Sequence, residues 1–155
     1  MATLYVMCGI PGCGKTTWAL NFINNKNINY VSRDGIRMEL LKDGEDYFSH
    51  EKEVFCKFVN IIRNSLKENK DIIADATHIN KFSRNKLFAA IGDIDYSIIF
   101  VFFNTPLEVC LGRNALRTGR ARVPDETIKT MWNNFQKPSI IENNKCKGLL
   151  LMKGD

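Results

Sequence analysis

The chain has 155 residues, of which 45% are hydrophobic and 25% charged, with a formal net charge of +5. This length suits one domain over residues 1–155, and no apolar run approaches the roughly 20 residues of a membrane span, so we expect no membrane partner. The five cysteines form no C-x-x-C pair, which disfavours a zinc site or a disulfide framework and favours a reducing, cytoplasmic location.

The first predicted elements surround a glycine-rich loop. An apolar strand at residues 4–8 leads into G-I-P-G-C-G-K-T-T at 9–17, and a helix-like run follows at 18–23. This is the setting that a G-x4-G-K-[ST] phosphate loop requires. Its glycines let several N–H groups face one anion, its lysine reaches the outer phosphates, and its first threonine ligates Mg²⁺. We therefore predict binding of a nucleoside triphosphate, ATP, by Gly9, Gly12, Cys13, Gly14, Lys15, Thr16 and Thr17, with Thr16 on the metal.

The following elements alternate between strands and helices. We predict a strand at 28–32, a helix at 32–41 capped by Ser32, a polar loop, and a long helix from a Ser49 cap to about residue 68. A strand at 71–75 and a helix at 80–90 come next. The continuous apolar run at 96–103 predicts a strand buried on both faces.

The last third of the chain predicts two more helices and a final strand. A helix is expected at 107–118, with Gly119 as its stop, and another begins around Pro124, placed at the first helical position. Residues 149–152 predict the last strand. The alternation indicates an α/β fold with a mostly parallel five-stranded sheet and helices on both faces, so ligands should bind beyond the carboxyl ends of the strands.

Asp34 and Arg37 follow the second strand and are three residues apart. In a helix they share a face, which allows two interpretations. Asp34 can act as the general base for an attacking hydroxyl while Arg37 binds a phosphate of the acceptor. Alternatively, the two form an exposed ion pair of little consequence.

Asp75 ends the third strand, and Thr77 and His78 follow it. The carboxylate can orient the Mg²⁺ shell or hold Arg37, or it can belong to an ordinary strand-end turn. Together with Arg37, we predict Asp75 and Thr77 as residues of the acceptor site. A histidine in such a loop is more often solvated than catalytic, and we expect this of His78.

Arginines are concentrated between residues 113 and 122, where no acidic residue occurs. Around the Gly119 hinge they predict a lid, at about 113–123, that closes over the triphosphate. Arg117 is the best candidate for stabilising the transferring phosphoryl group, with Arg113 and Arg120 as further donor-binding residues. Alternatively, these arginines balance a helix dipole.

Four motifs in register resemble the kinase domain of the bacteriophage polynucleotide kinase family. They are the phosphate loop at 9–19, S-R-D-G-I-R at 32–37, D-A-T-H-I-N at 75–80, and R-N-A-L-R-T-G-R-A-R-V-P at 113–124. The resemblance spans nearly the whole chain but not that family's phosphatase domain. Gly35 stands where the phage enzyme has a second acidic residue.

The resemblance implies a P-loop kinase fold like that of adenylate kinases and transfer of the ATP γ-phosphate to a nucleic acid 5'-hydroxyl. It assigns the base to Asp34, the acceptor phosphate to Arg37, the donor phosphates to Arg117, and the shape of the acceptor site to Asp75. The acidic stretch from Glu39 to Glu53 would repel a long polyanion. Two alternatives therefore stay open, namely a small-molecule kinase acting on a nucleoside, sugar or antibiotic, and a non-catalytic ATP-binding module.

Overall fold

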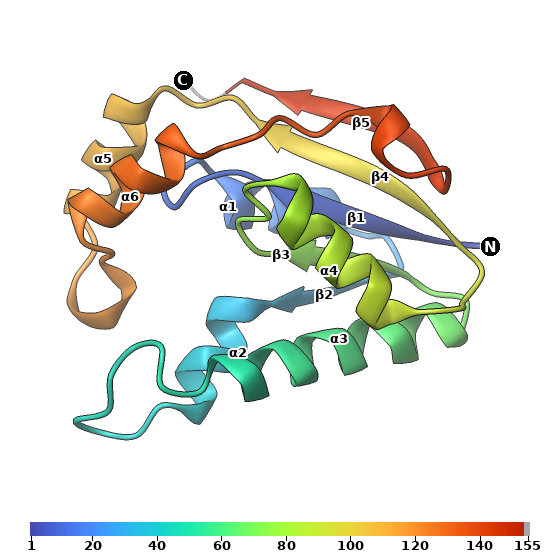
Figure 1. The fold of residues 1–155 in the computed structure, drawn as a ribbon, viewed down its shortest axis with the longest axis horizontal. Helices are drawn as coiled ribbons and strands as arrows, with labels where there is room; N and C mark the ends of the chain where they lie inside the picture. Colours follow the sequence, from blue (N-terminus) through green and yellow to red (C-terminus); the bar gives the residue numbers. More distant parts are fainter. Residues whose placement is uncertain (154–155) are drawn as a thin grey trace.

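The structure, a computed structural model that describes residues 1–153, is organised around a five-stranded parallel sheet (Figure 1). The strands run in the order β2-β3-β1-β4-β5. Their bounds are β1 Ala2–Cys8, β2 Ile28–Ser32, β3 Asp71–Asp75, β4 Tyr96–Phe103 and β5 Cys146–Met152. Every neighbouring pair is parallel, so the carboxyl ends of all the strands meet at one edge. This confirms the predicted sheet.

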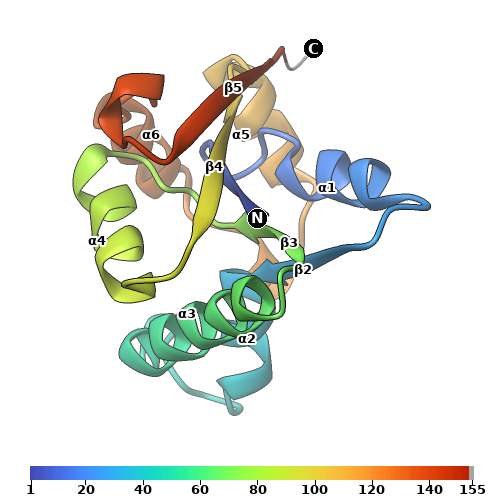
Figure 2. The ribbon, with the colours of Figure 1, turned by 90° about the vertical axis from the view of Figure 1, so that its right-hand side faces the viewer.

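Helices cover both faces of the sheet (Figure 2). Helices α3 (Glu51–Lys67) and α4 (Lys81–Ile91) pack on one face, whereas α1 (Lys15–Ile23) and α5 (Leu107–Ala115) pack on the other. Helices α2 (Arg33–Leu40) and α6 (Asp125–Asn133) are short and flank the carboxyl edge. None of the helices in the part of the chain that is described is long and apolar enough to cross a membrane.

Strand β1 lies at the centre and supplies both cores. Side chains of successive strand residues point to opposite faces. Leu4 and Val6 accordingly join the core beneath α3 and α4, while Met7 joins the core beneath α1 and α5. Strand β4 is likewise buried on both faces over its second half, as its apolar run predicts. This double burial fixes the register in which the site's loops leave the sheet.

Helix α5 is shorter than predicted, because it ends at Ala115 and not at Thr118. The buried Asn114 side chain accounts for the difference. Its amide donates to the Val123 carbonyl at 2.6 Å and accepts from the Val123 N–H at 3.0 Å. This pairing ties the returning chain to the helix end, so residues 116–122 form a loop that is held at both ends. Gly119 therefore opens a 3₁₀ turn, Gly119–Ala121, within that loop and does not stop the helix.

Two helices begin one residue later than predicted. Ser49 does not cap α3, since His50 holds the N-cap position without a side-chain hydrogen bond. The Ser49 hydroxyl instead donates to the Asp46 carbonyl at 2.7 Å, within the preceding turn. Pro124 stands at the N-cap of α6 and not at its first helical position. In contrast, Ser32 caps α2 as predicted, accepting from the Gly35 N–H at 3.1 Å.

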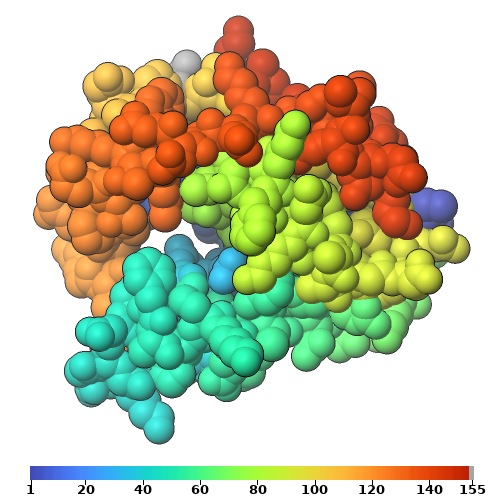
Figure 3. Space-filling view, viewed as in Figure 1, coloured from blue at the N-terminus to red at the C-terminus, as the bar shows by residue number. Residues whose placement is uncertain are grey.

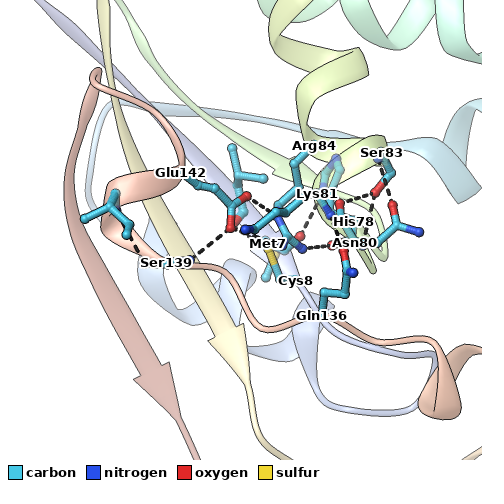
Figure 4. A network of polar contacts seen from close by, with 12 residues as sticks. Met7, Cys8, His78, Asn80, Lys81, Ser83, Arg84, Gln136, Ser139 and Glu142 are labelled. Atoms are coloured by element: carbon cyan, nitrogen blue, oxygen red, sulfur yellow. Dashed lines mark hydrogen bonds and ion pairs between the residues drawn. The ribbon is translucent and has the colours of Figure 1, made fainter.

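A buried ion pair joins α4 to the segment before β5 (Figure 4). The Arg84 Nε donates to the Glu142 Oε1 at 2.6 Å, and both side chains are almost fully buried. Arg84 also donates to the His78 carbonyl at 2.8 Å, and Glu142 accepts from the Ser139 N–H at 3.0 Å. The pair thereby fixes the loop after β3 against the last 3₁₀ turn, Ile140–Glu142.

His78 is buried, contrary to the expectation that it is solvated. Its Nδ1 lies 2.6 Å from the Met7 carbonyl oxygen, so Nδ1 carries the hydrogen and donates. Burial lowers the pKa of His78 to about 4, against the opposing effect of this hydrogen bond. The ring is neutral at pH 7 and serves the packing of the loop that follows β3.

We expect Glu142→Gln to lower the free energy of unfolding by about 3–5 kcal/mol, because it leaves the buried Arg84 guanidinium without its counter-charge. Urea unfolding monitored by circular dichroism measures this loss. Combining Arg84→Met with Glu142→Leu should recover part of it. The exposed pair Glu126–Lys129 is the matched control, and Glu126→Gln should produce no measurable change. Equal effects of the two Glu→Gln variants would contradict this prediction.

We expect acid to destabilise the fold through His78. Its folded pKa lies below the unfolded value of 6.5, so the stabilisation is complete above pH 6.5 and is lost as the pH falls toward 4. The linked loss is at most about 3 kcal/mol. His78→Asn, which tolerates the positive φ at this position, should show a shallower decline of urea stability between pH 6.5 and 4. Parallel declines in the two proteins would contradict the assignment.

Candidate active site

A cavity of about 310 Å³ opens at the carboxyl edge of the sheet. Figure 3 shows it as a hollow between the residues around 115–130 and the segment at 41–50. Most of the predicted site residues line this cavity, namely Gly12, Gly14, Lys15, Thr16, Thr17, Asp34, Arg37, Asp75, Thr77 and Arg117. Four others, Gly9, Cys13, Arg113 and Arg120, are not among its lining residues. The fold therefore brings the predicted donor and acceptor residues to one place.

The phosphate loop has the backbone that its glycines predict. Gly12 and Gly14 adopt φ values of +86° and +101°, which favour glycine. A Cβ on Gly12 would also lie 2.5 Å from the Cys110 carbonyl oxygen. The first N–H groups of α1 have no intrahelical acceptors, and no side chain caps them. These donors, at the positive end of the helix dipole, fit a phosphate group.

Lys15 is folded back over this loop. Its Nζ donates to the carbonyl oxygens of Gly9 and Ile10 at 3.0 and 3.1 Å. Both acceptors are backbone groups of the loop itself, so the ammonium is held at the rim of the phosphate cradle. Lys15 also lines the cavity, which places its charge where the outer phosphates of a nucleotide are expected.

The backbone groups of Gly9 and Cys13 hold the phosphate loop in place through hydrogen bonds. The Gly9 N–H donates to the Thr77 carbonyl at 3.0 Å, and the Cys13 carbonyl accepts from the Thr105 hydroxyl at 2.9 Å. Cys13 is buried, and this burial raises the pKa of its thiol. The thiol is therefore protonated at neutral pH, and the residue contributes its backbone more than its sulfur.

Asp75 joins the phosphate loop to the second strand. Its Oδ2 accepts hydrogen bonds from the Thr16 hydroxyl at 3.1 Å and the Tyr30 hydroxyl at 2.5 Å. Burial is the main cause, and the hydrogen bond to Asp75 the second, that raises the pKa of Tyr30 to about 12. The phenol therefore stays protonated and donates. A threonine hydroxyl beside a carboxylate is an all-oxygen donor set, which suits Mg²⁺. The partners of Asp75 thus favour the metal-orienting interpretation over contact with Arg37.

The Asp34 carboxylate is held through one of its two oxygens. Its Oδ1 accepts from the Tyr47 hydroxyl at 2.7 Å and also from the Arg37 Nη1. About 67% of the Asp34 side chain remains exposed. Burial is the main cause, and the hydrogen bond to Asp34 the second, that raises the pKa of Tyr47 to about 12. This hydroxyl therefore stays protonated. The carboxylate is therefore oriented by two donors while its side chain stays open to an incoming hydroxyl.

Arg37 is buried and almost fully engaged. Its Nε and Nη2 donate to the two oxygens of Glu51, each at 2.6 Å, and its Nη1 contacts Asp34 and Tyr47. Arg33 shares the Glu51 carboxylate through a longer contact of 3.4 Å. Burial lowers the pKa of Arg37, but the hydrogen bonds to Glu51 reverse this effect and raise it above its usual value. Arg37 therefore positions the Asp34 carboxylate in this structure.

The arginine-rich loop reaches the site at three points. Arg113 donates to the Gly12 carbonyl at 3.2 Å, which supports the phosphate loop from outside the cavity. Arg117 lines the cavity. Arg120 donates to the Lys42 carbonyl at 2.9 Å and so bridges to the segment on the opposite side. Of the three, Arg117 is the arginine that lines the cavity, and the lid stays a prediction.

Sequence reasoning missed the site residues Tyr30, Tyr47 and Phe48. It also noted Glu51 only as part of an acidic stretch. Tyr30 lies inside a strand, and the two aromatic residues lie in a loop without a motif. The useful signal was the Y-F pair at 47–48, because two adjacent aromatic residues are unusual in a polar loop.

The chain is similar to several known proteins. An L-seryl-tRNA(Sec) kinase of Methanococcus maripaludis is 25% identical over 140 residues, covering 87% of this chain and 53% of that protein. A shikimate kinase of Clostridium beijerinckii is 28% identical over 137 residues, covering 79% and 75%. One chain in the structure of the Pnkp1/Rnl/Hen1 RNA repair complex matches with a TM-score of 0.74 at 25% identity, covering 86% of this chain and 43% of that chain.

The chain thus spans about half the length of the first of these relatives and three quarters of the second. A family model described as an AAA domain matches residues 4–138. The sheet order and the solved neighbours show an α/β P-loop kinase fold. Since the model covers most of the chain, this protein belongs to the AAA domain family.

Proposed function

We propose that this protein is an ATP-dependent polynucleotide kinase that transfers the γ-phosphate to the 5'-hydroxyl of RNA or DNA, as in the bacteriophage polynucleotide kinase family. Residues 1–155 would act as one kinase domain with its lid at about 113–123. One observation carries the proposal most strongly: the exposed, oriented Asp34 carboxylate lines the same cavity as Lys15 and Thr16. The P-loop kinase family implies ATP binding with a divalent metal.

On the donor side, the phosphate loop and Lys15 would hold the triphosphate, with Thr16 on Mg²⁺ and Asp75 orienting that hydroxyl. Bound Mg²⁺ would neutralise charge on the phosphate oxygens. Arg117 would close over the γ-phosphate from the lid, and Arg113 would hold the loop backbone. These groups act by positioning and by charge, which is how proteins catalyse phosphoryl transfer.

On the acceptor side, Asp34 would take the proton of the 5'-hydroxyl. The hydroxyl oxygen then bonds to the γ-phosphorus, and the bond from that phosphorus to the β–γ bridging oxygen breaks, releasing ADP. Thr77, which also lines the cavity, would contact the acceptor. For Arg37 to bind a phosphate of the acceptor, the acceptor must replace Glu51 on the guanidinium.

The relatives favour a nucleic acid acceptor and leave one alternative open. The seryl-tRNA kinase and the RNA repair complex both concern RNA. The shikimate kinase acts on a small molecule, so a small-molecule kinase of the same fold is the second candidate. The exposed general-base candidate beside the phosphate loop argues against a non-catalytic module.

We expect the purified chain to transfer label from γ-labelled ATP to a 5'-hydroxyl oligonucleotide in the presence of Mg²⁺. Asp34→Asn should reduce kcat by about 10²- to 10⁴-fold with little change in ATP binding, because it removes the base and keeps the shape. Gel electrophoresis of the labelled oligonucleotide measures the rate.

Glu39→Gln is the matched control, since Glu39 is an exposed residue of the same helix and does not line the cavity. It should leave kcat unchanged. Shikimate and a mixture of nucleosides and sugars form the second arm. Transfer to one of these and to no oligonucleotide would establish the small-molecule alternative, and tight ATP binding without any transfer would contradict both kinase assignments.

We expect Tyr47→Phe to lower kcat roughly tenfold, the effect of losing one hydrogen bond of about 1.4 kcal/mol to the Asp34 carboxylate. The KM for ATP should stay constant, because the Tyr47 hydroxyl bonds Asp34 and Arg37, which are not residues of the phosphate loop. The ring of Phe would keep the stacking of Arg37, whose Cζ lies 4.8 Å from the Tyr47 centroid. An unchanged kcat would show that the hydroxyl does not position the base.

A further inference from the structure

Phe48 is exposed although it lines the cavity. About 60% of its surface is accessible, which is unusual for a phenylalanine inside a polar, acidic segment. Its ring packs edge-on against Tyr47, with the centroids 4.7 Å apart and the planes at 87°. The Arg37 Cζ lies 5.5 Å from its centroid. These contacts hold one side of the ring and leave most of its surface free for a ligand.

The position of Phe48 is tied to the reacting groups. Tyr47, its neighbour in the chain and in space, donates to the Asp34 carboxylate at 2.7 Å. The aromatic pair is therefore held at a fixed distance from the oxygen that would accept the acceptor's proton. A molecule whose hydroxyl is placed on Asp34 therefore shares the cavity with the Phe48 ring.

From this placement we propose that Phe48 forms a stacking subsite for the nucleobase of the acceptor's 5'-terminal nucleotide. The inference rests on the proposed kinase function and deepens it by naming what the acceptor presents beside its hydroxyl. Every nucleobase has a flat π-face, so an aromatic platform binds it without regard to sequence. A sugar or a polyhydroxylated acid has no such face and needs hydrogen-bonding partners that a phenyl ring does not supply.

The charge around Phe48 agrees with recognition of the terminal base. Its segment carries Asp43, Glu45 and Asp46, and acidic side chains repel a phosphate backbone. Affinity on this side must therefore come from an uncharged part of the acceptor. Stacking of one base on Phe48 provides such a contact, and the remaining chain would leave the site away from this segment.

Two acceptors that differ only in the terminal base test the inference. One is a 5'-hydroxyl oligonucleotide with an ordinary terminal nucleotide, and the other carries a stable abasic tetrahydrofuran residue at that end. We expect the wild-type protein to favour the base-bearing end by about 10- to 100-fold in kcat/KM, the range that base–aromatic stacking supplies. Phe48→Ala should reduce this preference to within about twofold, by lowering only the rate with the base-bearing end.

Phe48→Trp should keep the preference, because indole also stacks on bases. Phe82→Ala is the matched control, since Phe82 is 77% exposed on α4 and does not line the cavity. The KM for ATP should be constant in all four proteins.

Equal rates with the two ends in the wild type, or a preference that survives in Phe48→Ala, would overturn the subsite while leaving the kinase activity in place. No transfer to either end would overturn the proposed function and the subsite with it.

Discussion

The Asp75 carboxylate is the contact on which the site's geometry depends. It ends the strand next to β1, and its Oδ2 holds the Thr16 hydroxyl of the phosphate-loop helix and the Tyr30 hydroxyl of β2. Three separate segments are thus tied together by one buried oxygen. Asp75 is buried, and a buried carboxylate is costly unless hydrogen bonds satisfy it, as these two hydroxyls do.

The proposed acceptor side of the site differs, because its charged side chains are already paired with one another. Glu51 neutralises Arg37 through two short hydrogen bonds and also reaches Arg33. Breaking a buried, bidentate pair is costly, so a phosphate that replaces Glu51 must supply equally good geometry. Where the acceptor carries no phosphate at that point, the pair stays closed and Arg37 acts only on Asp34. An anionic acceptor would therefore have to overcome the free-energy cost of separating Arg37 from Glu51. A base stacked on Phe48 would not incur this cost.

Sequence alone predicted the parallel sheet and the backbone of the phosphate loop, because both depend on local signals. The glycines of the phosphate loop encode a backbone conformation, and the apolar runs encode burial. The acceptor half depends on contacts between distant segments, such as Glu51 with Arg37 and Tyr30 with Asp75. Nothing in the local sequence determines which side chain a strand or loop residue will meet. His78 and the shortened α5 follow the same rule, since burial against Met7 and the pairing of Asn114 with Val123 are both tertiary effects.

In the proposed kinase, the donor residues and the acceptor residues come from different parts of the fold. One scaffold could therefore bind different acceptors. The donor residues leave β1 and β3, the central strands, whose positions are fixed by packing on both faces. The acceptor residues instead lie on α2, on the loop that follows it and at the start of α3, beside the edge strand β2. That loop can change in length and composition without disturbing the sheet, because it contributes little to either core. Arg120 bonds the Lys42 carbonyl, so the region of the proposed lid and this loop are in contact. In the proposed kinase, changes within the 41–51 segment would therefore alter the choice of acceptor while the central strands and the phosphate loop stay in place.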